Sequence, residues 1–211
     1  MSSNGTEFPK STAGQRQTGT APAGKHSFLS DIQALRERAR KHVFNGAVTP
    51  SYGADREAVL QMLNEALATE LVCVLRYRRH YFMANGALGE AIKGELLAHA
   101  NEEQAHADQI AERIVQLGGE PDMNPMGIAS RSHSEYVEGN TLAEMVREDL
   151  VAERVAIESY TEMIRFIGDG DPTTRRMLEG ILAVEEEHAE ELASMLDTLG
   201  EAREGADPTS M

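Results

Sequence analysis

The segments HANEEQAHADQI at residues 99–110 and ILAVEEEHAEEL at residues 181–192 decide how this chain folds. Each contains a Glu-x-x-His motif, which pairs Glu103 with His106 and Glu185 with His188. Residues three apart lie on one face of a helix, so each motif directs a carboxylate and an imidazole to the same side. Either motif alone is close to what chance gives in a chain this rich in glutamate. The significance of the motifs therefore depends on the helices around them.

Apolar residues recur every three or four positions through both segments and through the regions that precede them, which predicts four long amphipathic helices. The expected helices span residues 56–84, 88–117, 141–168 and 172–200. Thr141 and Glu144 have the spacing of a capping box, and Asp171-Pro172 supplies an N-cap followed by proline. A shorter helix is expected at residues 30–44, and the stretch from Pro121 to Asn140 reads as a long loop.

A lone glutamate interrupts the apolar face of the helix that comes before each motif. Glu70 lies 33 residues before Glu103, and Glu153 lies 32 residues before Glu185. Tyr77 and Tyr160 each follow the lone glutamate by seven residues, which is two helical turns. This internal repeat predicts two related helical hairpins, each of which supplies half of a pseudo-twofold site.

Burying four carboxylates together is prohibitively costly unless cations compensate their charge. Two divalent cations would neutralise them, and two neutral imidazoles would complete the ligand set. Oxygen and imidazole ligands favour iron or manganese, whereas structural zinc sites usually contain thiolates. The predicted metal-binding and catalytic residues are Glu70, Glu103, His106, Glu153, Glu185 and His188.

Other polar residues near the motifs have weaker signals. Tyr77 and Tyr160 are candidates for hydrogen bonding beside the metals, although a plain core tyrosine fits the same pattern. His99 is a candidate accessory ligand, with structural packing the favoured interpretation. Glu102, which directly precedes the first motif, is expected to be solvated or to line a cavity.

The composition fits one sizeable helical domain that carries a strong negative charge. The chain has 211 residues and a formal charge of −15, yet residues 1–44 contain seven Lys/Arg against three Asp/Glu. The acidic remainder is expected to repel nucleic acid and attract cations. Cys73 is the single cysteine, and no run of apolar residues reaches the roughly 18 that a membrane span needs, so a soluble cytoplasmic protein is expected. The predicted organisation is a disordered tail (1–27), an N-terminal helix and linker (28–54), a four-helix bundle (55–200) and a flexible tail (201–211).

The motifs resemble those of the ferritin-like superfamily, and of bacterioferritins most closely. The matching stretches are Asn64-Glu65, Thr69 to Val72 with Tyr77, Glu103 to Asp108, Asp149 to Glu153, and Glu185 to His188. The likeness covers about residues 56–199. It implies a ferritin-like four-helix bundle with a long crossover between its second and third helices, and an extra helix at the N-terminus.

This resemblance also implies a di-iron ferroxidase centre within one chain. Glu70, Glu103 and His106 would hold one iron, Glu153, Glu185 and His188 would hold the other, and Glu103 and Glu185 would bridge them. In that family Fe²⁺ is oxidised by O₂ or H₂O₂, and the ferric product is stored inside a hollow homo-oligomer. Such a protein would act in iron storage and detoxification.

The chain departs from the bacterioferritin pattern in three places. Gln104 stands where a haem-ligating methionine is expected, so haem is not favoured. The polar stretch after Leu199 does not match a fifth helix, which favours a Dps-like dodecamer over a 24-subunit shell. Residues 1–54 have no counterpart in a typical bacterioferritin.

Two further functions use the same sequence features. One is a di-metal carboxylate peroxidase or a manganese catalase on the same bundle, although the chain has no rubredoxin-type cysteine cluster. The other is a Dps-like protein that protects DNA by contacts from its N-terminal arm.

Overall fold

The computed structural model describes residues 31–204, with side chains described as far as residue 200. This part of the chain contains six α-helices and no strands, so the predicted all-α class is confirmed. The helices are α1 (Ile32–Lys41), α2 (Arg56–Met83), α3 (Gly86–Gln116), α4 (Pro125–Arg131), α5 (Leu142–Ile167) and α6 (Pro172–Glu204). The tail predicted to be disordered at residues 1–27 lies outside the described residues, as do residues 205–211 of the tail predicted to be flexible. The last helix continues past Gly200, where the sequence pattern placed its end.

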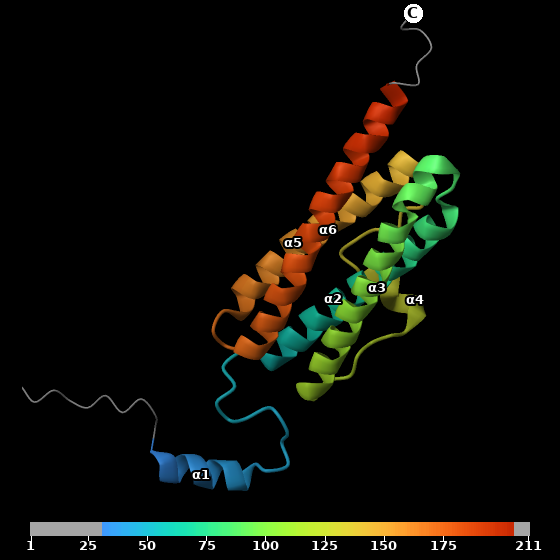
Figure 1. The fold of residues 1–211 in the computed structure, drawn as a ribbon. Helices are drawn as coiled ribbons and strands as arrows, with labels where there is room; N and C mark the ends of the chain where they lie inside the picture. Colours follow the sequence, from blue (N-terminus) through green and yellow to red (C-terminus); the bar gives the residue numbers. More distant parts are fainter. Residues whose placement is uncertain (1–30, 205–211) are drawn as a thin grey trace, which may run out of the picture. The chain divides into compact units, whose positions relative to one another are not determined.

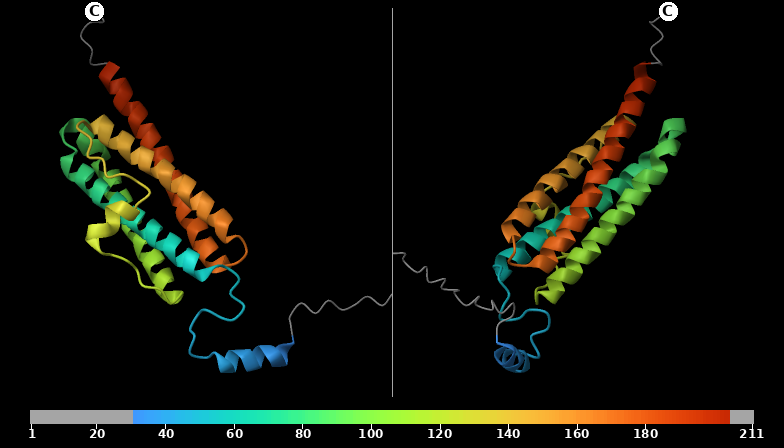
Figure 2. Two further views of the ribbon diagram at one scale, coloured as in Figure 1. Left: turned by 180° about the vertical axis from the view of Figure 1, so that it is seen from behind. Right: turned by 60° about the vertical axis from the view of Figure 1, so that its left-hand side comes forward.

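Four of the helices form two antiparallel hairpins that pack into a bundle. Helices α2 and α3 lie side by side, as do α5 and α6 (Figure 1). Helix α2 also packs against α5, and α3 packs against α6 (Figure 2). Residues 117–141 connect α3 to α5 and form the predicted long crossover. Helix α1 belongs to a separate unit of the chain and buries none of its side chains.

The starts of these helices follow the capping residues of the sequence. The Oδ1 atom of Asp55 accepts hydrogen bonds from the first backbone amides of α2. At the start of α5, Thr141 and Glu144 form the complete capping box. Asp171 accepts from the backbone amide of Thr174 at the start of α6. Each cap satisfies amide groups that have no partner within the helix, which fixes where the helix begins.

Two glycines allow the chain to reverse direction at helix ends. Gly86 follows α2 with a φ of 74°, and Gly118 follows α3 with a φ of 77°. Residues with a Cβ atom rarely adopt this left-handed conformation. The tight connection between α2 and α3 therefore depends on glycine at position 86.

The crossover contains a short helix that the loop interpretation missed. Asn124 caps α4 by accepting from the amide of Met126, and Pro125 occupies the first helical position. Asn followed by Pro is an N-cap signal, but the helix is only seven residues long and buries no side chain. Without an apolar face, it has no periodic pattern by which a helix can be recognised.

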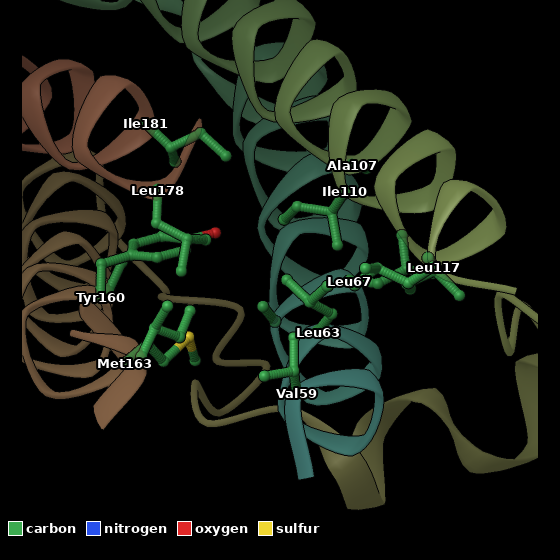
Figure 3. Close-up of a cluster of buried hydrophobic side chains, with 14 residues drawn as sticks. Val59, Leu63, Leu67, Ala107, Ile110, Leu117, Tyr160, Met163, Leu178 and Ile181 are labelled. Atoms are coloured by element: carbon green, nitrogen blue, oxygen red, sulfur yellow. The ribbon is translucent and has the colours of Figure 1, made fainter. Parts of the chain in front are cut away.

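Two clusters of buried apolar side chains fill the bundle at different levels along its axis. The first cluster draws from all four bundle helices, and its side chains point toward one another between them (Figure 3). Its members are Val59, Leu63, Ala66, Leu67, Ala107, Ile110, Ile114, Leu117, Ala156, Tyr160, Met163, Ile167, Leu178 and Ile181. The second cluster contains Cys73, Tyr77, Ala84, Leu96, Ala100, Val146, Ala152, Leu192 and Leu199. On every bundle helix, at least one buried glutamate lies between the residues of one cluster and those of the other: Glu70, Glu103, Glu153 and Glu185.

Helix α2 is the one described helix that is long and apolar enough to cross a membrane by length and composition alone. A core helix of a soluble protein meets the same criterion. Here Leu63 and Leu67 of α2 lie in the first cluster and Cys73 and Tyr77 in the second. The apolar character of α2 is thus explained by its place in the bundle core.

A buried ion-pair network joins α2, α5 and the crossover. Asp149 on α5 accepts from Arg76 Nε at 2.9 Å and lies 2.8 Å from His80 Nδ1. All three side chains are essentially inaccessible to solvent. Arg76 also donates to the carbonyl oxygen of Glu135, and His80 Nε2 lies 3.0 Å from that of Glu138. This network fastens the crossover to the outer face of the α2–α5 pair.

We expect Asp149→Asn to lower the free energy of unfolding by about 3–5 kcal/mol, because the change leaves the Arg76 charge buried without its counter-ion. Urea unfolding followed by circular dichroism measures this loss. Glu158→Gln, at an exposed glutamate of the same helix, is the matched control and should leave the unfolding curve unchanged. Equal stability of the Asp149 variant and the native chain would contradict a structural role for the network.

Candidate metal centre

The six residues predicted as metal ligands come together in the polar layer between the two apolar clusters. Glu70 lies on α2, Glu103 and His106 on α3, Glu153 on α5, and Glu185 and His188 on α6. The four glutamates are at most 1% exposed, and the two histidines at most 4%. Each residue is held at this level because core residues of the same helix lie in the turns before and after it. The bundle thus buries four carboxyl groups and two imidazoles at one level.

The six side chains form two overlapping groups, each able to hold a metal ion. One group is Glu70, Glu103, His106 and Glu185, and the other is Glu103, Glu153, Glu185 and His188. Within each group, one ligand atom from every residue lies within 4.8 Å of the others. Glu103 and Glu185 belong to both groups, so their carboxylates stand where two neighbouring cations would share ligands.

Each imidazole turns its Nδ1 atom toward three carboxylates. His106 Nδ1 lies 2.9 Å from Glu185 Oε1 and 3.6 Å from oxygens of Glu70 and Glu103. On the other side, His188 Nδ1 lies 3.4 Å from Glu103 Oε1, 3.6 Å from Glu185 Oε2 and 4.0 Å from Glu153 Oε2. The two nitrogens therefore share the carboxylates of Glu103 and Glu185 as neighbours.

Most of the atoms that face this space have no hydrogen-bond partner. They are Glu70 Oε2, Glu103 Oε1, Glu153 Oε2, both carboxyl oxygens of Glu185, His106 Nδ1 and His188 Nδ1. A buried polar atom without a partner costs on the order of 1–3 kcal/mol, and more when the group is charged. Seven such atoms at one place are expected in a site built to coordinate cations, which would supply the missing partners.

Several groups at the site have pKa values that favour their protonated forms when no cation is present. Burial and the neighbouring carboxylates raise the pKa values of Glu70 and Glu153 above the usual range. Burial lowers the pKa of His188, but the facing carboxylates outweigh this and raise it to about 10. The pKa of His106 is raised in the same way. Without metal, the site therefore retains protons on groups that must lose them to become ligands.

Two tyrosines hold the outer glutamates in a crosswise arrangement. Tyr77 on α2 donates its hydroxyl hydrogen to Glu153 Oε1 on α5. Tyr160 on α5 donates to Glu70 Oε1 on α2. Burial and the nearby carboxylates raise the pKa values of both phenols, so both remain protonated donors. The sequence repeat placed both tyrosines beside the site, but it did not reveal that each bonds to the glutamate of the opposite hairpin.

His99 lies just outside the six-residue centre. Its ring stacks on that of His188 with centroids 4.1 Å apart, and its Nε2 atom lies 2.8 Å from Glu191 Oε2. Burial and the neighbouring His188 lower the pKa of His99. Glu102, expected to be solvated or cavity-lining, contacts His188 Nε2 at 2.8 Å. The pairing of Glu102 and Glu191 with these rings had no sequence signal, because each glutamate lies in an acidic run on a partly exposed helix face.

Comparisons with known proteins agree with the fold. Residues 60–202 match the Ferritin-like domain family. A bacterioferritin of Desulfovibrio desulfuricans is 31% identical over 156 residues, which cover 70% of this chain and 81% of that protein. The DNA protection during starvation protein of Pyrococcus furiosus is 33% identical over 140 residues, 64% of this chain and 75% of that protein.

A solved structure of the bacterioferritin-related protein of Bacteroides fragilis, described as a dodecameric thioferritin, superposes with a TM-score of 0.70. It is 29% identical, and the match covers 74% of this chain and 94% of that one. The family match spans most of the chain and includes the four bundle helices with all six residues of the candidate metal centre. The chain belongs to the ferritin-like family.

Proposed function

We propose that this protein stores and detoxifies iron, and that it oxidises Fe²⁺ at a centre formed by Glu70, Glu103, His106, Glu153, Glu185 and His188. The observation that carries this proposal is the pair of overlapping ligand groups that share Glu103 and Glu185. Carboxylates shared in this way would hold two cations side by side, where an oxidant could take one electron from each. Kinship with bacterioferritins supports iron as the metal.

The ligand chemistry favours the oxidised product. Carboxylate oxygens are hard ligands and stabilise Fe³⁺ relative to Fe²⁺, which makes the bound ion a better electron donor. Two Fe²⁺ ions give up two electrons. Together with two protons, these electrons reduce O₂ to H₂O₂. When H₂O₂ is the oxidant, two electrons and two protons reduce it to two water molecules. The protein would bind both ions in one buried layer and position the outer carboxylates through Tyr77 and Tyr160. Its glutamates and histidines would hold or release the protons.

Glu103→Gln should reduce the initial rate of Fe²⁺ oxidation by more than about tenfold. Losing a residue that only hydrogen-bonds to a metal ligand already costs metal sites about 10–100-fold in affinity or activity, and Glu103 would itself be a ligand to both ions. Ferric absorbance after mixing anaerobic Fe²⁺ with aerated protein measures this rate. Glu158→Gln serves as the matched control and should oxidise iron like the native chain.

Two results would contradict the proposed ferroxidase activity. One is native protein that does not accelerate oxidation beyond buffer. The other is undiminished activity in the Glu103 variant when circular dichroism shows it to be folded. Metal analysis of protein purified without added metal tests iron against manganese, and O₂ release from peroxide by a manganese-loaded protein would favour a catalase instead.

Cation binding should release protons and weaken as the solution becomes more acidic. The raised pKa values of Glu70 and Glu153 mean that these carboxyls keep protons that a cation must displace. The raised pKa values of His106 and His188 have the same effect. Affinity for Co²⁺, used as a stable substitute for Fe²⁺, should therefore fall between about pH 8 and about pH 6.

Calorimetric titrations in two buffers of different ionisation enthalpy would count the released protons. Binding without proton release and with the same affinity at both pH values would show that the groups at the centre already have their ligand charges. The Glu103→Gln variant provides the reference for Co²⁺ bound elsewhere on the acidic surface.

The stored product requires an enclosed space, so the proposed function includes a hollow homo-oligomer. A twelve-chain shell is favoured because the bacterioferritin-related structural relative is described as dodecameric. Native mass spectrometry should give a particle of about twelve times the 23.1-kDa chain. A monomer or dimer would contradict shell formation, and a particle of twenty-four chains would contradict the smaller shell.

A further inference from the structure

Helix α1 carries an apolar stripe that is exposed. Its sequence, IQALRERARK, places Ile32, Leu35 and Ala39 on one face at helical spacing. Asp31 caps the helix by accepting a hydrogen bond from the backbone amide of Gln33 at 2.8 Å. No side chain of α1 is buried, and Ile32 and Leu35 are 44% and 41% exposed. An isolated helix of ten residues is marginal in water, so α1 would gain stability from a surface to pack against.

Basic side chains border this stripe on both sides. At 3.6 residues per turn, Arg36 and Arg40 fall beside one edge of the stripe and Arg38 falls beside the other. The helix contains four basic residues and one acidic residue, which gives it a net charge of +3. A surface that is complementary to α1 would therefore have an apolar centre with acidic groups on either side.

A groove of about 360 Å³ between α2 and α5 has this composition. Its apolar residues are Met62 on α2 and Met163 and Phe166 on α5. Each of the two helices also adds an acidic residue, which is Glu65 on α2 and Glu162 on α5. Glu162 is exposed, and the side chain of Glu65 is 36% exposed. Acidic groups thus stand on both helices of an apolar groove, and no lysine or arginine is among its lining residues.

The apolar part of the groove reaches from the bundle core to solvent. Met163 is buried and belongs to the first apolar cluster, whereas Phe166 is 62% exposed. The thioethers of Met62 and Met163 are flexible and can adapt to apolar side chains that arrive from outside. An exposed apolar patch with a polar border is typical of a protein–protein contact. The groove therefore has the properties of a docking surface for a helix.

We propose that α1 of one chain docks in the α2–α5 groove of a second copy. Its apolar stripe would contact Phe166, and its arginines would lie beside Glu65 and Glu162. A second copy is favoured as the occupant because the basic helix and the acidic groove are complementary and belong to the same chain. Each chain contributes one helix and one groove, so the contact can repeat around a closed assembly. This contact concerns how chains are joined and goes beyond the proposed iron chemistry.

Cross-linking between two co-expressed, differently tagged copies of the full-length chain tests the contact. One copy carries Ala39→Cys on the α1 stripe, and the other carries Ser159→Cys in the groove lining. A short bismaleimide should join these two copies, whereas the native Cys73 is buried and should not react. Gly94→Cys is the matched control, because it lies at an exposed position of α3 where an added Cβ meets nothing within 4 Å.

Substitutions on either side of the contact should lower the yield of this cross-link. Phe166→Ser should lower it about fivefold or more, since an aromatic anchor in an interface commonly contributes a factor of that size. Arg36→Glu together with Arg40→Glu should lower it about threefold or more. Glu65→Lys together with Glu162→Lys in the groove copy should then restore it. All of these residues lie outside the candidate metal centre, and circular dichroism should show each variant to be folded.

Three results would overturn the contact. One is a cross-link to Gly94→Cys that forms as efficiently as the cross-link to Ser159→Cys. Another is a cross-link that forms only when both cysteines are placed in one chain. The third is an oligomer, seen by native mass spectrometry, that gives no cross-link, which would leave the proposed shell intact. In that case, binding to duplex DNA or to anionic vesicles that is lost in the Arg36 and Arg40 variant would assign α1 to one of those partners instead.

Discussion

The structure depends on one unfavourable arrangement, the burial of four carboxyl groups and two imidazoles at the same level of a helical bundle. Apolar clusters above and below this layer exclude water and hold the helices together. The layer itself contributes unpaired polar atoms, which oppose folding unless protons or cations occupy it. The fold therefore carries a cost at its centre that the hydrophobic residues on either side must offset, and cation binding would convert that cost into stability.

The two hairpins contribute nearly equal sets of residues to this layer. Each provides one outer glutamate, one Glu-x-x-His motif and one tyrosine, and each tyrosine bonds to the glutamate of the other hairpin. These two hydrogen bonds thus cross between α2 and α5, one of the two helix pairs at which the hairpins meet. The hairpins are joined in sequence only by the long crossover, which Arg76, His80 and Asp149 fasten to the same pair of helices. On the α3–α6 side, polar contacts between the hairpins are made by His99 with Glu191, by Glu102 with His188, and by Arg113 with Asp171.

The sequence predicts the features that depend on the periodic spacing of apolar residues or on local capping motifs. Apolar spacing and capping residues such as Asp55 and Thr141 identify the bundle helices to within a few residues, and the seam positions of Glu70 and Glu153 bring the six central residues together. The residues that could not be predicted act through contacts between helices. Glu102 and Glu191 look like neighbouring surface glutamates until the packing of α3 against α6 places them beside His188 and His99. Asp149 likewise reads as an ordinary helix residue, because its two partners are distant in sequence.

The crosswise tyrosines also distinguish the two oxygens of each outer glutamate of the proposed metal centre. Each phenol occupies the Oε1 atom of Glu70 or Glu153, so only Oε2 of that carboxylate faces the interior. With Oε1 already accepting a hydrogen bond, Oε2 is the oxygen of each outer glutamate that has no partner and is available to a cation. Glu185, by contrast, keeps both oxygens free toward the centre. In the proposed centre, carboxylates bound mainly through Oε2 would leave coordination positions on each cation for molecules that arrive from outside.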